Sequence, residues 1–138
     1  NSTEEESTKK GFIKWVNEYL LKAKELECDA IDLYAARCGL LHKYTPDSKL
    51  TRDQKARKFI YVWGIANENQ LKKIVDKTNI RDQYRIIHVN NLFEAFVLGI
   101  ESFIKELQEN PTKKKIALEK AQSFFISRPA DITKWKKL

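Results

Sequence analysis

Glycine, cysteine and histidine are scarce in this 138-residue chain, which has four, two and two of them. Four glycines leave little room for a glycine-rich phosphate loop. Two histidines and two unclustered cysteines argue against a zinc site, and we expect neither a metal nor a cofactor. Cys28 and Cys38 form no C-x-x-C pair and cannot complete a disulfide framework, so we expect free thiols in a reducing cytoplasm.

Long apolar runs are also missing. The longest, residues 59–63, is far too short to cross a bilayer, and we expect no membrane partner. The composition, 42% hydrophobic and 33% charged, is typical of a well-charged globular protein, and 138 residues favour one domain. Lys and Arg outnumber Asp and Glu by 26 to 19. This excess favours polyanionic partners, namely RNA, DNA or an acidic protein surface.

Apolar residues at helical spacing predict most of the fold. A first clear helix starts at Gly11, after residues 1–10, which form either a capped start or a frayed end. Further helices are predicted over residues 67–78, from a capping box at Asn91, and from Pro111, which suits a first helical position. The expected buried face of the Asn91 helix consists of Phe96, Ile100, Phe103 and Leu107, and that of the Pro111 helix of Ala117, Ala121, Phe124 and Phe125.

Two short segments, residues 59–63 and 84–89, are rich in β-branched and aromatic residues and are predicted to be strands. For residues 59–63, a helix continuing from Thr51, which would cap a short basic helix, is the alternative. Pairing of the two segments across the intervening helix would form one small β-α-β element. The predicted fold class is mainly α: one helical domain over residues 1–138 with a two-stranded element and a basic tail at 130–138.

Residues 29–42 are predicted to lie on a central helix that starts at Asp29, the N-cap, and ends near Tyr44, because Pro46 cannot continue it. The helix is apolar on nearly all sides, and Arg37 falls on the apolar stripe itself. A guanidinium there is costly to desolvate unless it is paired or meets an anionic ligand. Two explanations stay open. Either Arg37 binds an anion, or it pairs with a carboxylate of another helix, for which the candidates are Glu18, Glu94 and Glu101.

Arg37-Cys-Gly-Leu-Leu-His42 has the spacing Arg-x-x-x-x-His on a helix end. This motif resembles the signature of the HEPN superfamily (higher eukaryotes and prokaryotes nucleotide-binding), small helical proteins that are often metal-independent ribonucleases. Active members usually carry a polar residue after the Arg, where this chain has Cys38, and the strand pair would be an addition to their helical bundle. The resemblance implies an RNA-acting protein, an endoribonuclease of a toxin or defence system. It also implies a homodimer, with a protein antitoxin as a further partner.

The resemblance assigns Arg37 to clamp a phosphate and His42 to act as acid or base. Residues five apart diverge by about 140° on an ideal helix, so the two meet one phosphate only if the helix bends or ends between them, for example at Gly39. Alternatively, two copies of the helix could pool their residues in a dimer. Supporting RNA contacts are predicted just beyond the helix and in the basic stretch that follows: Lys43, Tyr44, Arg52, Lys55 and Arg57.

A competing class is a non-catalytic helical interaction module that binds a protein or nucleic acid through its basic surface. The enzyme requires Arg37 and His42 to converge on an accessible cleft, whereas the module tolerates both being buried and paired. In the second case His42 would cap the last carbonyls of its own helix.

Overall fold

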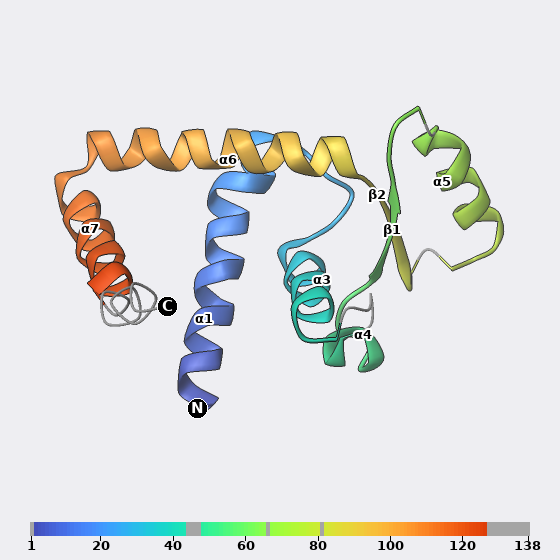
Figure 1. Ribbon diagram of the computed structural model, residues 1–138. Coiled ribbons are helices and arrows are strands. Elements are labelled where there is room, and N and C mark those ends of the chain that lie inside the picture. The colour runs from blue at the N-terminus through green and yellow to red at the C-terminus, as the bar shows by residue number, and fades with distance from the viewer. Residues whose placement is uncertain (1, 44–47, 66, 81, 127–138) are drawn as a thin grey trace, which may run out of the picture. The chain divides into compact units, whose positions relative to one another are not determined.

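The computed structural model of the chain describes residues 2–43, 48–65, 67–80 and 82–126 (Figure 1). It is mainly helical with one two-stranded parallel sheet in the described residues, which confirms the prediction of a mainly α fold with a two-stranded element. The chain forms two compact units, residues 1–102 and 103–138, and the division falls inside a helix. None of the helices within the described ranges is long and apolar enough to cross a membrane.

The N-terminal helix begins at Ser2 rather than at Gly11. Helix α1 (Ser2–Trp15) continues through a π-helical turn, η1 (Val16–Leu20), into the short α2 (Leu21–Ala23). The apolar pattern starts only at Phe12 because most of the residues before it face solvent. Periodicity therefore locates the part of this helix that packs, not the point where the helix starts.

The Arg37 motif lies on helix α3 (Ala30–Lys43). Asp29 caps it as predicted, since its Oδ1 accepts hydrogen bonds of 2.9 Å from the backbone N–H groups of Ile31 and Asp32. Only the first half of α3 is central, because Leu40 and Leu41 in the next turns are 48% and 59% exposed. The prediction that α3 is buried along its whole length is therefore wrong.

A single helical turn, α4 (Lys49–Arg52), follows. The prediction that Thr51 caps a basic helix is wrong, because the cap is Ser48. The Ser48 backbone N–H donates to Thr51 Oγ1 at 2.8 Å, and the Thr51 N–H donates to Ser48 Oγ at 3.3 Å, which forms a capping box. The helix stops at Arg52, and Gln54 just beyond has a positive φ of 56°.

The predicted β-α-β element is present. Strand β1 (Lys58–Val62) pairs in parallel with β2 (Tyr84–His88), and α5 (Glu68–Lys77) connects them. Residues 59–63 are thus largely strand, and the helical alternative is wrong. One sheet face places Phe59 and Ile87 in the helical core, and the other packs Ile86 against α5. Both faces are covered, as is usual for parallel strands.

Helix α6 (Val89–Glu109) starts directly after β2, so the predicted start at Asn91 is wrong. Its predicted buried face is only partly correct: Ile100, Phe103 and Leu107 are half-buried, but Phe96 is 45% exposed. The buried residues of the helix are Ala95 and Gly99. A Cβ on Gly99 would lie 3.1 Å from the Cα of Leu20. Small side chains face inward here because the two backbones approach too closely for large ones.

The second unit contains the end of α6 and helix α7 (Pro111–Ile126). The predicted boundary is confirmed. Asn110 caps α7, and its Oδ1 accepts a 3.0 Å hydrogen bond from the N–H of Lys113. On the predicted core face, Ala117 is half-buried and Ala121 is exposed. The side chains of Phe124 and Phe125 and the basic tail at 130–138 lie outside the described residues.

Candidate functional site

Arg37 is half-buried where α1 packs against α3. Its guanidinium carbon lies 5.8 Å from the centre of the Phe12 ring, a cation–π distance. Within the described part of the chain no carboxylate is bonded to it. The three acids considered from the sequence lie elsewhere: Glu18 pairs with Lys14, Glu94 pairs with Lys24, and Glu101 is exposed.

A second cation, Lys9, is linked to Arg37 through two aromatic rings. The rings of Phe12 and Tyr34 are 5.7 Å apart, centre to centre, and Lys9 Nζ is 5.9 Å from the centre of the Tyr34 ring. Lys9, Phe12, Tyr34 and Arg37 therefore form one group, which we call the cation–aromatic seam. Each helix contributes a cation and a ring three residues apart, so that they share a helix face.

The seam differs from the surroundings of three other half-buried cations. Lys24 and Lys72 pair with glutamates, and Arg57 pairs with aspartates. Lys9 and Arg37 instead contact aromatic rings, and no described carboxylate is bonded to either. At the seam, partly buried positive charge thus has no counter-ion within the described ranges of the chain.

The remaining predicted catalytic and RNA-binding residues are only partly placed. The side chains of His42 and Lys43, and all of Tyr44, lie outside the described residues. The backbone of α3 is helical without interruption across Gly39 as far as Lys43. The helix therefore does not end between positions 37 and 42, which on a continuous helix are about 140° apart around the axis. Arg52 and Lys55 are exposed in and just after α4.

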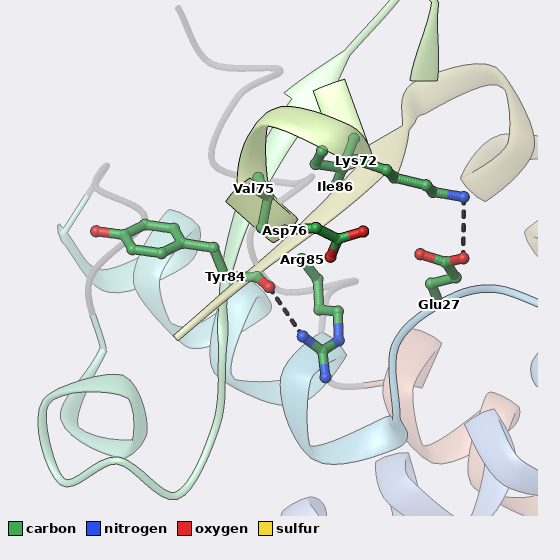
Figure 2. A pocket seen from close by; sticks show the side chains of 7 residues that line it. All are labelled: Glu27, Lys72, Val75, Asp76, Tyr84, Arg85 and Ile86. Atoms are coloured by element: carbon green, nitrogen blue, oxygen red, sulfur yellow. Dashed lines mark hydrogen bonds and ion pairs between the residues drawn. The ribbon is translucent and has the colours of Figure 1, made fainter. Parts of the chain in front are cut away.

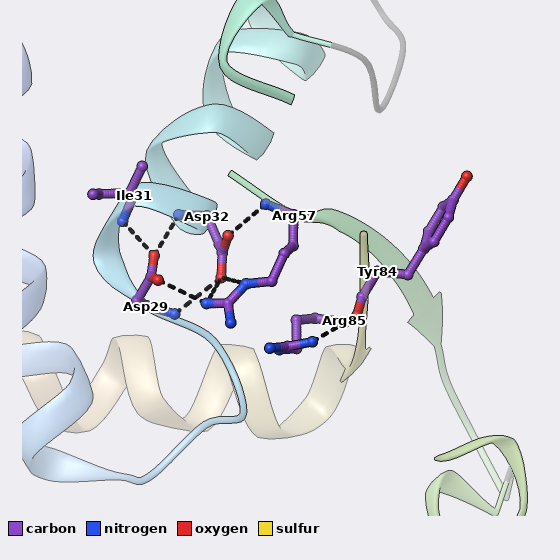
Figure 3. Close-up of polar contacts among 6 residues, drawn as sticks. All are labelled: Asp29, Ile31, Asp32, Arg57, Tyr84 and Arg85. Atoms are coloured by element: carbon purple, nitrogen blue, oxygen red, sulfur yellow. Dashed lines mark hydrogen bonds and ion pairs between the residues drawn. The ribbon is translucent and has the colours of Figure 1, made fainter. Parts of the chain in front are cut away.

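Arg57 is held by two carboxylates (Figure 3). Its Nε donates to Asp32 Oδ2 at 2.9 Å, its backbone N–H donates to Asp32 Oδ1 at 2.7 Å, and its Nη2 bonds both Asp32 and Asp29. Asp32 is 1% exposed. Hydrogen bonding to Asp32 raises the pKa of Arg57. Because this guanidinium joins α3 to the start of β1, we leave Arg57 out of the candidate RNA surface.

Cys28 lies next to this ion pair. Burial, and then the negative charges of Asp32 and Asp29, raise the pKa of its thiol from 9.0 to about 12. The thiol therefore stays protonated at neutral pH and is a poor nucleophile. Both cysteines are free thiols, as predicted.

Two open pockets adjoin Arg85, and Figure 2 shows the side chains that line the smaller one. One, of about 160 Å³, lies between α5 and β2, and the other, of about 360 Å³, reaches Cys28 and Arg57. Lys72 pairs with Glu27 at 3.0 Å in the first, and Arg85 Nη1 donates to the Tyr84 carbonyl at 3.0 Å. Lys72 and Arg85 are thus already bonded within the protein. The pocket linings also lack the apolar character of most small-molecule sites.

His88 joins the ends of the two strands. Its Nε2 is 3.2 Å from the carbonyl oxygen of Gly64, while its buried Nδ1 has no hydrogen-bond partner in the described part of the chain. His88 therefore belongs to the fold rather than to a site. Nor do three Asp, Glu, His or Cys side chains gather into a metal-ion site anywhere in the described ranges.

Sequence reasoning missed Lys9 and Asp32. Lys9 precedes Phe12 by three residues, as Tyr34 precedes Arg37, and this shared spacing was the available signal. Asp32 follows Asp29 by one helical turn, but its partner Arg57 is distant in sequence.

No family model, curated protein or solved structure matches the chain. The resemblance to the HEPN superfamily therefore stays a prediction.

Proposed function

We propose that this protein is a metal-independent endoribonuclease of the HEPN kind that acts as a homodimer. The observation that carries the proposal is the half-buried guanidinium of Arg37, which contacts the Phe12 ring and no described carboxylate. A cation in that position is stabilised by an anion that arrives with a ligand. Arg binds phosphate in a bidentate manner, and RNA is the anion that the resemblance implies.

The continuity of α3 favours a site made by two copies. Positions 37 and 42 are about 140° apart around a continuous helix, which favours a site that takes the two residues from different copies. Leu40 and Leu41 lie three and four residues after Arg37 and are largely exposed. A twofold contact between the ends of two α3 helices would cover these leucines. It would also bring Arg37 of one copy to His42 of the other.

The chemistry needs only these two residues and the RNA itself. The 2′-oxygen attacks the adjacent phosphorus, the bond from phosphorus to the 5′-oxygen breaks, and a 2′,3′-cyclic phosphate and a 5′-hydroxyl result. His42 takes the proton from the 2′-hydroxyl or gives one to the leaving 5′-oxygen. Arg37 stabilises the charge that develops on the phosphoryl oxygens.

A mixing experiment tests both the activity and its shared site. Arg37→Ala and His42→Ala should each abolish RNA cleavage measured in EDTA, with no loss of folding. In a mixed dimer of the two variants, one of the two composite sites keeps both residues. With random pairing, half of the dimers are mixed, so the mixture should recover about a quarter of the wild-type rate.

Lys73→Ala is the matched control, since Lys73 is an exposed lysine on α5, remote in sequence from the motif. It should cleave RNA as the wild type does. A wild-type protein that leaves RNA intact in EDTA would refute the proposal. Inactive single variants whose mixture stays inactive would refute the composite site.

A toxin or defence role in the cytoplasm, with a protein antitoxin, follows from the resemblance alone. Growth arrest by the wild type but not by Arg37→Ala would support it.

The second candidate function is a non-catalytic module that binds nucleic acid through a basic surface. It is favoured by the exposed lysines in the first turns of α7, namely Lys113, Lys114 and Lys115. Such a protein would bind RNA with strong salt dependence, would leave it intact, and would bind equally well as Arg37→Ala.

A further inference from the structure

We propose that Lys9 binds the phosphate next to the one held by Arg37, so that the preferred substrate is single-stranded RNA with two consecutive phosphates at the site. This inference rests on the proposed ribonuclease function and names a residue that the Arg-x-x-x-x-His motif does not contain. It assigns substrate binding to α1 as well as to α3.

The spacing of the seam supports two phosphates rather than one. Lys9 Nζ lies 5.9 Å from the centre of the Tyr34 ring, and the guanidinium of Arg37 lies 5.8 Å from the centre of the Phe12 ring. The ring centres are 5.7 Å apart. Each cation thus contacts its own ring, and the two rings are neighbours, so that the cations belong to one row of contacts and do not share a ring. A nucleic-acid strand, which carries one negative charge per nucleotide, matches such a row.

The three lysines of α1 differ in their contacts with the described residues. Lys10 pairs with Glu6 at 2.8 Å, and Lys14 pairs with Glu18 at 3.8 Å, each one turn away. Lys9 is half-buried and has no carboxylate partner among the described residues. Arg37 likewise has no carboxylate partner in the described part of the chain, and two phosphates would supply one counter-ion to each cation.

The aromatic rings explain how the two cations are positioned before a ligand binds. A ring face attracts a cation weakly, by about 0.5–1 kcal/mol at exposed sites, and so positions it without neutralising its charge. Tyr34 is buried and Phe12 is half-buried, so both rings are fixed by the packing of α1 on α3. Replacing the ring contacts by phosphate contacts then requires little movement of either helix.

Short substrates of defined length test the inference. A dinucleotide has one phosphate, and the two trinucleotides that extend it on the 5′ or the 3′ side have two. For the wild-type protein, kcat/KM should be about tenfold higher for one of these trinucleotides than for the dinucleotide, as expected for one added charged contact. In Lys9→Gln this ratio should fall to about one, whereas the matched control Lys10→Gln should keep it.

Binding of uncleavable 2′-deoxy versions separates the inference from the proposed function. The same trinucleotide should bind more tightly than the dinucleotide, and Lys9→Gln should remove the difference. If the wild type cleaves no RNA but this binding pattern holds, the ribonuclease proposal fails and the two-phosphate site stands. A ratio in Lys9→Gln equal to that of the wild type would overturn the inference. So would equal losses on both substrates, because they would show only a structural effect on Arg37.

Discussion

The two ends of helix α3 differ in how the arginine next to each of them is stabilised. At the N-terminal end, Asp29 and Asp32 bind the guanidinium of Arg57, and Asp32 is almost completely buried. Toward the C-terminal end, Arg37 is half-buried against the Phe12 ring, and exposed leucines follow it. One end is an internal ion pair that joins α3 to the sheet. The other has a cation whose counter-ion is not found among the described residues.

This difference separates stability from function within one helix. A buried, fully bonded ion pair is costly to break, because the partner left behind keeps an uncompensated charge. A cation on a ring at partial burial contributes little to stability and is available to a ligand. Substitutions at the two ends should therefore have different consequences.

The largest effect should come from Asp32. Asp32→Ala leaves Arg57 without its main partner inside the protein and should lower the free energy of unfolding by about 3–5 kcal/mol, measured by urea denaturation. Asp53, an exposed aspartate just after α4, gives the matched control. Asp53→Ala should change the free energy by no more than about 0.5 kcal/mol. Equal free energies of unfolding for Asp32→Ala and Asp53→Ala would show that the ion pair at the N-terminal end of α3 does not stabilise the fold.

Cys28 reports the same burial by its reactivity. Because its pKa is raised from 9.0 to about 12, its thiolate fraction at neutral pH is about a thousandfold below that of an unperturbed thiol. In a Cys38→Ser background, alkylation of Cys28 should be about a thousandfold slower in the folded protein than in guanidinium chloride. The effect should disappear above about pH 12, where the folded thiol ionises as well. Equal rates at neutral pH would contradict the burial of this end.

The smallest effect on stability should come from Arg37. Arg37→Ala removes a cation–π contact and should lower the free energy of unfolding by about 1 kcal/mol or less. Arg57→Ala, the same change at the other end, should cost several times more in the same urea titration, since it leaves Asp32 buried and unpaired. Unfolding of Arg37→Ala would assign Arg37 to the fold and end the ribonuclease proposal.

Local signals were sufficient for much of the fold. The Asp29 cap, both strands and the boundary at Asn110 were predicted from residues next to one another in the chain. The start of α6 was missed because helix formation at Val89 continues directly from β2. Its two buried residues, Ala95 and Gly99, were also missed. Helical periodicity selects large apolar residues, whereas the close approach of the backbones at Gly99 requires a small one.

The candidate site was predicted less completely than the fold. Arg37 was identified because one charge interrupts an apolar stripe, a feature visible in sequence. Lys9 was not, because it contacts Tyr34, which is distant in the chain. Arg57 was predicted to contact RNA because it lies in a basic stretch, and only its contacts with Asp32 show that the fold uses it.

By itself, the sequence determined the helices, the strands and the oddly placed arginine, since caps, breakers and periodicity act between near neighbours. Only the tertiary structure decided which charges are neutralised. Ion pairing depends on distances of a few ångströms between residues that are far apart in the chain, and no local pattern encodes those distances. Two arginines of equal charge thus differ, because packing gave Arg57 a buried aspartate and Arg37 an aromatic ring.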